Sequence, residues 1–596
     1  MPFKVGVTTG LYYIAHDVSL ASTVKKIGYA LTRGASVIEI SGDTPHEISY
    51  TEGIELRSIA KNQGIDLFFH GSLTVPIEMP ERTDWRDAQD HIEKSIRSAV
   101  HAGCRYVLFH AALHFWVELL TYTGTKLTIT MCDHAGHFVS EILYEDPRLR
   151  DWFIKNMRTL SELPYDQYIL SEDELNDAYY RAHSMQRQWE NTKIKENDEK
   201  LDAEINKTAR VDPNKARALQ EEMQKFRQKI AEESGREEAK KRREFMEDAV
   251  RKKLTNPDVD KRKWRVDSHG KLVDAYKIVA HYLFFNKDPQ WMSMAEVYKN
   301  VLERYKIDYS SNEWLLDTWN VAERKNDTEF KQFFYAVVGA KFLEGHMKAA
   351  LEWMENTLIP KELAGKPELQ EIARKLKITI EIPDARDPKY AGRYMLCHPK
   401  QIYSAVKTVR NVLKTDRIWM TIDNEHLATQ GFDPMVEMAE MARRYPEFGK
   451  MVISVHSTHP TPLHSHYPVE LGDTVVYTLL WYIRQAGAGR EKDHTVYLIF
   501  ERGGGDDPFR QSVDALKLMA KFLEMDTPPE ELPLEFYGLD KFSTAFDVER
   551  QKQIMMDHRF DVLKDLFEVP EEDWGLLSTS AVKKGKKEIF KKEELR

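Results

Sequence analysis

Eight short apolar runs rich in β-branched residues recur along the 596-residue chain, and they constrain its fold more than any other feature. Their ranges are 3–9, 35–41, 65–70, 105–110, 377–382, 417–423, 451–456 and 495–501. Their continuous hydrophobicity is typical of strands buried on both faces of a parallel sheet. The segments between them have helical spacing, as in 81–103. Eight such units predict an α/β fold, the (β/α)8 TIM barrel, which typically needs about 250 residues.

The rest of the chain must then be insertion and tail. We expect the first half of the barrel in 1–115 with strands one to four, a helical insertion in 116–375, the second half in 376–545 and a helical, basic tail in 546–596. Within the insertion, mixed charges over about 185–255 predict an exposed helical hairpin or coiled-coil arm that turns near "VDPN". Apolar and aromatic helices over about 270–365 predict a small all-α subdomain. The arm is either a spacer or a binding site for an unidentified partner.

The composition narrows the class of protein. A net charge of −10 argues against a generally basic surface that coats nucleic acid, although it leaves room for a local basic cleft. The three cysteines lack CxxC spacing, which excludes a disulfide scaffold or a cysteine zinc knuckle and suits a reducing compartment. Because no apolar run reaches about 18 residues, we expect no membrane span and a cytoplasmic protein.

Metal-capable side chains stand at or near the ends of six predicted strands. They are His70, His110, Glu381, Asp423, His456 and Glu501. The C-terminal strand ends of a (β/α)8 barrel open onto one face, so these side chains should converge there. Burying a charge costs several kcal/mol unless it is paired or bound to a metal, and apolar strands otherwise avoid such residues. The pattern therefore predicts a metal site.

The stretch "VISVHSTHPTPLHSH" adds histidines directly after the seventh strand. Besides His456 it contains His459, His464 and His466. Histidine is the commonest metal ligand among side chains. We expect His459, like His114 after the fourth strand, to be a loop residue more readily than a part of the mechanism. The glycine run "RGGGDDP" (502–508) favours a flexible loop, because no Lys-Ser/Thr follows it.

Several of these segments resemble the xylose isomerase-like barrel superfamily, and within it they are most similar to endonuclease IV, the multinuclear zinc family of apurinic (AP) endonucleases. The matching segments are "FFHGSLTVPIEMPER", "AVHAGCRYVLFHAALH", "ITIEIPDARDPKYAGRYMLC", "MTIDNEHLATQGFD", "VISVHSTHP", "HSHYPVELGD" and "VYLIFERGGG". They occur in family order on both sides of the predicted insertion. The most specific is "IDNEHLATQGFD", in which His426 follows Asp423 by three residues.

The resemblance implies three metal positions. The first would be held by His70, His110 and Glu381, the second by Glu381, Asp423, His456 and Glu501, and the third by His426, His464 and His466. Glu381 would bridge the first two, and Glu381 and Glu501 would be the catalytic residues that orient the attacking water. Imidazole and carboxylate ligands suit Zn²⁺, with Mn²⁺ or Fe as competitors.

Two departures from the family pattern matter. The family has Asp-x-His where this chain has His464-Ser465-His466, so an anionic ligand becomes neutral. A less neutralised cluster should bind its metal more weakly or require a more anionic substrate. After strand two, the family loop with basic and amide residues that grips DNA is replaced by the acidic "ISGDTPHEIS" (40–49). The chemistry can therefore be retained while the substrate differs.

Three functions remain open at this point. The first is a metal-dependent phosphodiesterase or endonuclease that acts through a metal-activated water on damaged DNA, as in DNA repair, or on another phosphodiester. The second is a single-metal sugar or keto-acid isomerase, epimerase or dehydratase that uses Glu381, Asp423, His456 and Glu501. The third is a non-catalytic scaffold whose arm binds a partner. About three metals, one metal or none per chain would distinguish them.

Overall fold

The computed structural model describes residues 2–9, 23–31, 34–42, 47–72, 75–111, 127–129, 132–161, 170–255, 264–266, 269–306, 325–385, 388–392, 394–462, 466–501 and 509–539. Four features discussed in the sequence analysis lie outside these residues. They are His114, His464, the glycine run 502–508 and the tail 546–596.

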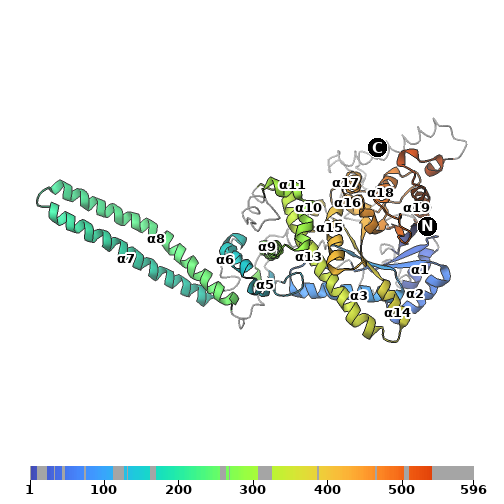
Figure 1. Cartoon of the computed structure of the whole chain (residues 1–596), viewed down its shortest axis with the longest axis horizontal. Coiled ribbons are helices and arrows are strands. Elements are labelled where there is room, and N and C mark those ends of the chain that lie inside the picture. Colours follow the sequence, from blue (N-terminus) through green and yellow to red (C-terminus); the bar gives the residue numbers. More distant parts are fainter. Residues whose placement is uncertain are drawn as a thin grey trace, which may run out of the picture.

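Eight parallel strands close into a TIM-like barrel (Figure 1). They are β1 (Phe3–Thr8), β2 (Val37–Ser41), β3 (Asp66–His70), β4 (Tyr106–His110), β7 (Lys377–Glu381), β8 (Ile418–Asp423), β9 (Val452–His456) and β10 (Val496–Phe500). Their order around the barrel is β1-β10-β9-β8-β7-β4-β3-β2. Every residue of β2, β9 and β10 is buried, as continuous hydrophobicity predicts for strands covered on both faces. The predicted closed parallel α/β barrel is confirmed.

Helices of the barrel units cover the outside of the sheet. They are α1 (Thr23–Leu31), α2 (Tyr50–Gln63), α3 (Arg82–Ala102), α14 (Pro367–Lys375), α15 (Pro399–Leu413), α17 (Pro434–Arg444), α18 (Thr474–Gln485) and α19 (Phe509–Glu524). The short helix α16 (Asn424–Thr429) lies directly at the C-terminal end of β8. Short 3₁₀ segments join them at Pro388–Tyr390, Phe448–Met451, Pro529–Glu531 and Leu534–Tyr537. In α3 the Glu81 carboxylate caps the first turn, and Gly103 ends the helix at a φ of 79°. The buried stripe Ala88, Ile92, Ile96 and Ala99 faces the core.

Along the chain, a largely helical segment separates β4 from β7, although the two strands pair directly and place His110 opposite Glu381. Its elements beside the barrel are β5 (Leu127–Ile129), α5 (Val139–Glu145), α6 (Pro147–Ser161), β6 (Trp264–Val266), α9 (His269–Phe285), α10 (Pro289–Val297), α11 (Lys299–Arg304), α13 (Thr328–Trp353) and the π-helix η4 (Met354–Glu362). Strands β5 and β6 form a separate antiparallel pair that the sequence patterns did not predict. Helix α13 packs against α3 and α15, so these helices rest on the outer layer of the barrel.

A helical hairpin projects away from the barrel, with α9, α10 and α13 lying between the two (Figure 1). It consists of α7 (Glu172–Thr208) and α8 (Pro213–Thr255), which pack along each other. The turn lies where "VDPN" predicts it, but α7 begins at Glu172, ahead of the expected position near 185, because Ser171 and Glu174 form a capping box there.

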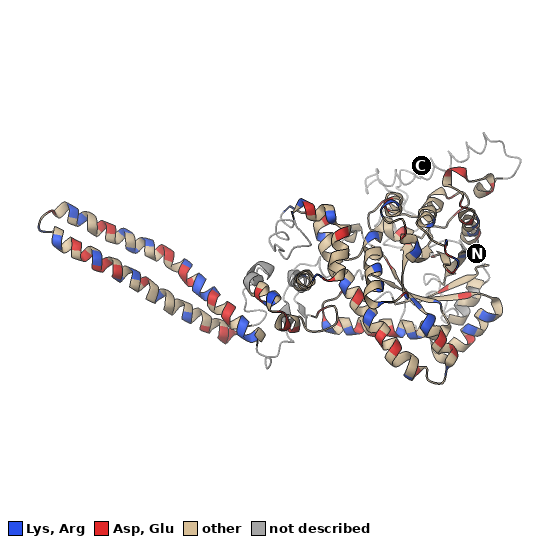
Figure 2. Ribbon diagram, in the orientation of Figure 1, with Lys and Arg blue, Asp and Glu red and all other residues tan. Residues whose placement is uncertain are grey.

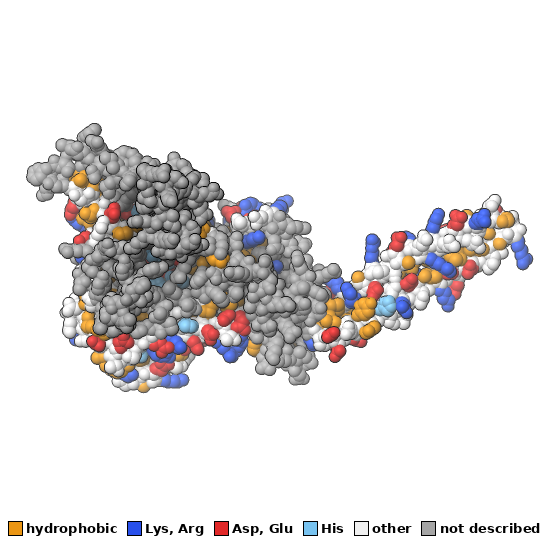
Figure 3. Space-filling model, turned by 180° about the vertical axis from the view of Figure 1, so that it is seen from behind, with side chains coloured by type: hydrophobic (Ala, Val, Ile, Leu, Met, Phe, Trp, Pro, Cys, Tyr) orange, Lys and Arg blue, Asp and Glu red, His pale blue; other side chains and the backbone are white. Residues whose placement is uncertain are grey.

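The surface of this hairpin carries charges of both signs along its whole length, as Figures 2 and 3 show from opposite sides. Small and apolar side chains, including Ala182, Ile205 and Ile230, are buried between the two helices. Cross-helix pairs such as Arg227–Asp198 at 2.5 Å add to this seam. Among the described residues, the helices include none with an apolar stretch that could cross a bilayer.

Candidate metal centre

The carboxyl ends of six barrel strands bring the predicted metal-capable side chains together. Register across neighbouring strands sets His110 beside Glu381 and Asp423 beside His456. His110 Nε2 lies 3.2 Å from Glu381 Oε2, and His70 Nε2 lies 3.9 Å from the same oxygen. The Glu381 carboxylate thus reaches the two histidines of β3 and β4.

His456 stands at the middle of the cluster. Its Nδ1 atom lies 2.9 Å from Glu381 Oε1, 3.1 Å from Glu501 Oε2 and 3.5 Å from Asp423 Oδ2. Glu381, Asp423 and His456 are fully buried, whereas the Glu501 side chain keeps 23% of its surface exposed. Of the three carboxylates around His456, that of Glu501 is therefore the one in contact with solvent.

The ligand atoms form three adjacent groups, each within 4.8 Å, that could each hold a metal ion. The groups are His70, His110 and Glu381; Glu381, Asp423 and His456; and Asp423, His426 and Glu501. The first two coincide with the first two predicted positions, with Glu501 beside the second. Glu381 and Asp423 each belong to two groups, so the three groups form one continuous chain of donors.

The third predicted position is composed differently. His426 groups with Asp423 and Glu501 rather than with His466, whose ring centroid lies 6.5 Å from that of His426. His464 lies outside the described residues, so the position that would combine all three histidines stays a prediction.

Several donor atoms of the cluster are buried without a hydrogen bond. They are both carboxylate oxygens of Glu381, Asp423 Oδ2, His110 Nε2, His456 Nδ1 and Glu501 Oε2. Buried polar atoms are nearly always satisfied, and leaving one unsatisfied costs about 1–3 kcal/mol. These atoms instead face one another across the cluster. Imidazole nitrogens and carboxylate oxygens in this arrangement fit a divalent cation such as Zn²⁺.

Backbone contacts turn the other histidines toward the cluster. His426 Nδ1 lies 2.8 Å from the carbonyl oxygen of Ile382, and His70 Nδ1 lies 3.0 Å from that of Gly71. Each contact directs the Nε2 atom of its ring toward the carboxylates. Such outer contacts commonly fix the ring nitrogen that a metal ligand offers.

The charges of the cluster shift the pKa values of its members. Burial would raise the pKa of Glu381, but adjacent His456 and His110 outweigh it and hold the pKa below its ordinary value. Burial would lower the pKa of His426, yet Asp423 and Glu381 raise it to about 9. Burial would also lower the pKa of His466, but Glu425 and Glu501 raise it to about 10. Imidazolium protons thus balance the carboxylates, and a bound cation would replace them.

Two carboxylates beside the cluster were missed in the sequence. Glu39, inside β2, is fully buried and lies 3.2 Å from His456 Nε2. Glu425 is also fully buried, accepts the backbone N–H of His466 at 2.8 Å and lies 2.8 Å from its Nδ1. An ionisable residue inside an apolar run was the available signal for Glu39, since the same reasoning singled out the strand ends.

His459 takes no part in any of these groups within the described residues. Its Nδ1 lies 2.9 Å from Asp473 Oδ2. The other oxygen of Asp473 accepts the backbone N–H of Val476 at the start of α18. This position agrees with the expectation of a loop residue.

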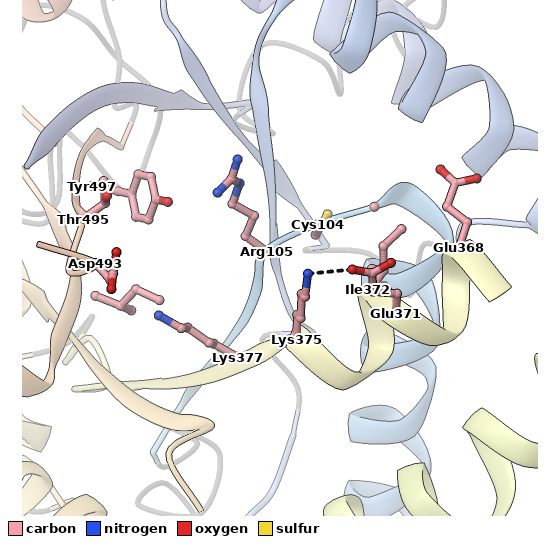
Figure 4. A pocket seen from close by; sticks show the side chains of 12 residues that line it. Cys104, Arg105, Glu368, Glu371, Ile372, Lys375, Lys377, Asp493, Thr495 and Tyr497 are labelled. Atoms are coloured by element: carbon pink, nitrogen blue, oxygen red, sulfur yellow. Dashed lines mark hydrogen bonds and ion pairs between the residues drawn. The ribbon is translucent and has the colours of Figure 1, made fainter. Parts of the chain in front are cut away.

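A pocket of about 420 Å³ opens at the other end of the barrel (Figure 4). We call it the basal pocket; its lining includes Arg105, Glu371, Lys375, Lys377 and Tyr497. Its cations already have partners: Arg105 with Asp66 at 2.6 Å, and Lys375 with Glu371 at 2.6 Å. Lys377 lies 4.0 Å from the centroid of the Trp419 ring. The two ion pairs balance the charges of Arg105 and Lys375.

Comparison with known proteins adds no family assignment. No model of a known protein family matches the chain, and a search of curated proteins finds no match either. The resemblance to endonuclease IV therefore stays a prediction from the motifs.

Proposed function

We propose that the protein is a metal-dependent hydrolase of phosphodiester bonds, of the endonuclease IV type. The observation that carries the proposal is the sharing of Glu381 and Asp423 among three adjacent ligand groups. A centre that uses one metal needs no such continuity. Phosphodiester hydrolysis uses it, because several cations can together neutralise the charge that develops on the phosphoryl oxygens.

The residues divide the work by position. His70, His110, Glu381, Asp423, His426, His456 and Glu501 would hold up to three divalent cations, preferably Zn²⁺, with Mn²⁺ or Fe as alternatives. Bound cations lower the pKa of water toward neutrality. Burial would raise the pKa of Glu501, but adjacent His456 holds it well below its ordinary value. This partly exposed carboxylate would therefore stay ionised and orient a water molecule at the solvent side. Glu381, whose pKa is held below its ordinary value, stays ionised and holds the two neighbouring positions together.

We also propose a substrate and a partner. Damaged DNA is the first candidate substrate, and another phosphodiester is the alternative. We further propose that the helical segment between β4 and β7 is an insertion into the barrel, and that its charged hairpin contacts an unidentified partner. Both charge signs on the hairpin surface support a protein partner over nucleic acid (Figure 2).

A second function has one observation in its favour. Glu381, Asp423 and His456 form a complete group by themselves, with Glu501 3.1 Å from His456. A single-metal isomerase, epimerase or dehydratase would need these four side chains only. His70 and His110 would then have no role, although both lie within 4 Å of Glu381.

The experiment that tests the proposal combines metal analysis with a cleavage assay. We expect two to three zinc ions per purified chain and cleavage of duplex DNA that contains an abasic site. Glu381→Gln should remove both properties, and the matched substitution Glu371→Gln, at an exposed residue of the basal pocket, should keep both. If the fully loaded protein leaves this DNA and simple phosphodiesters intact while isomerising a sugar with one metal, the hydrolase proposal is wrong.

A further inference from the structure

The carboxylate of Glu39 is a fully buried acidic group beside the cluster. It lies inside β2 rather than at the strand end and is fully buried. Tyr106 Oη donates a hydrogen bond to its Oε2 at 2.6 Å. Apolar side chains of the barrel interior lie around this pair, including Phe68, which stacks on the Tyr106 ring at 4.0 Å between centroids, and the Ser454 hydroxyl also hydrogen-bonds Tyr106. A buried carboxylate in such surroundings is costly unless it balances a partner.

That partner is His456. Its Nε2 atom lies 3.2 Å from Glu39 Oε1 and is hydrogen-bonded to Oε2 at 3.5 Å. The opposite nitrogen, Nδ1, faces the carboxylates of Glu381, Asp423 and Glu501. A neutral imidazole carries one N–H, and a carboxylate accepts but does not donate. With a cation held at Nδ1, the single N–H of His456 would therefore be on Nε2, where Glu39 accepts it.

We propose that Glu39 is a positioning residue for the central metal position. It acts by fixing His456 in the Nε2–H tautomer. This inference rests on the proposed function only in requiring that a cation is held there. Tyr106 completes the relay because its hydroxyl donates a hydrogen bond to Glu39 Oε2. A carboxylate that accepts from a ligand histidine also makes that ligand more basic.

The arrangement explains why a glutamate is present at this depth. Without it, His456 would be able to place its proton on Nδ1 and present an N–H to the ligand carboxylates. The low polarity of the barrel interior makes the Glu39–His456 interaction stronger than the same contact in water. The relay Tyr106–Glu39–His456 then orients His456. His70 and His426, by contrast, are each oriented by a backbone carbonyl.

The test is a metal titration of the full-length chain with Zn²⁺ against a competing chelator, together with the absorption spectrum of the Co²⁺-loaded protein. Glu39→Gln keeps the size of the side chain but removes the charge that selects the tautomer. We expect zinc affinity at one position to fall about 10- to 100-fold, with an altered Co²⁺ spectrum. Tyr106→Phe keeps both Glu39 and His456 and should give a smaller change in the same direction.

A matched control separates loss of positioning from loss of stability. Glu344→Gln removes another buried carboxylate, which pairs with Lys341 at 2.6 Å in the helical segment. It should lower the unfolding temperature and leave zinc affinity and the Co²⁺ spectrum as in the wild type.

The outcomes separate this inference from the proposed function. If Glu39→Gln and Tyr106→Phe bind Zn²⁺ and Co²⁺ like the wild type, the inference is overturned, even where DNA is cleaved. If both variants lose affinity while the wild type cleaves no phosphodiester, the inference stands and the function does not. A wild-type protein that binds no divalent metal overturns both.

Discussion

The two ends of the barrel both carry many charged side chains, but they arrange them in opposite ways. At the candidate metal centre, carboxylates and histidines from different strands are buried and face one another without completed hydrogen bonds. In the basal pocket, Arg105 and Lys375 each pair with an acidic residue and lie largely exposed. A cluster of charged residues indicates a binding site where its unpaired donor atoms converge on one point. Charged residues that pair with one another or lie in solvent do not indicate such a site.

The strongest way to break this comparison is Asp423→Asn. Asp423 Oδ1 accepts the backbone N–H groups of Glu425 and His426 and caps α16, whereas Oδ2 faces the centre. Asparagine is an equally good N-cap, so the fold should persist. Because Asp423 belongs to two ligand groups, we expect zinc affinity to fall on the order of a hundredfold or more, measured by competition with a chelator.

A matched control for this variant is Asp433→Asn. Asp433 caps α17 in the same manner, through Met435 and Val436, but lies away from the centre. It should leave the metal content unchanged. Wild-type zinc affinity in Asp423→Asn would contradict the assignment of Asp423 as a ligand.

The pH dependence of metal binding sharpens the comparison. The pKa of His426 is raised to about 9, so in the metal-free protein this imidazole holds a proton below that pH. A metal must displace the proton, so apparent affinity should rise with pH, and the contribution of His426 to that rise should level off above about 9. Each displaced proton contributes about tenfold per pH unit. Zinc titrations across neutral and alkaline pH, with proton release followed in weakly buffered solution, measure both quantities.

A flat pH profile without proton release would count against His426 as a ligand. Replacing His426 by alanine should make the profile shallower by the contribution of one proton. The remaining slope would then report on the other histidines of the centre.

The smallest effect is expected at the basal pocket. Arg105→Ala removes a cation whose side chain is 59% exposed and which contacts Asp66 at 2.6 Å. Asp66 keeps a second partner, Lys4, at 2.5 Å. Because Arg105 is largely exposed, its pair with Asp66 contributes about 1 kcal/mol or less to the free energy of unfolding. Chemical denaturation should show that small loss with no change in bound zinc. A loss of metal in this variant would mean that the two ends of the barrel are coupled.

The barrel and the convergence of its strand ends were predictable because buried strands have a distinctive hydrophobic pattern. In a closed parallel barrel, the C-terminal ends of all these strands lie at the same face of the barrel. Glu39 was recognisable as an ionisable residue inside an apolar run, but its contact partner was not predictable. It contacts His456 across 417 positions of sequence and lies inside its apolar run. Only the closure of the barrel brings β2 and β9 to face each other.

The grouping of His426 with Asp423 and Glu501 was likewise hidden. Two of these residues are three positions apart, but Glu501 comes from β10, and which loop histidine reaches His426 depends on the path of the chain after His456. His466 adopts a φ of 43°, an uncommon conformation for a residue other than glycine, and Glu425 accepts its backbone N–H. Residue types and spacing do not encode such a turn.

The projecting hairpin has a consequence for how the protein behaves in solution. Helix α8 alone has 43 residues, and at about 1.5 Å per residue it spans about 65 Å. A compact chain of this length would have a radius of gyration of about 25 Å. The hairpin therefore raises the friction of the molecule out of proportion to its mass. A single copy should elute early from a size-exclusion column, so light scattering rather than elution volume will give its oligomeric state.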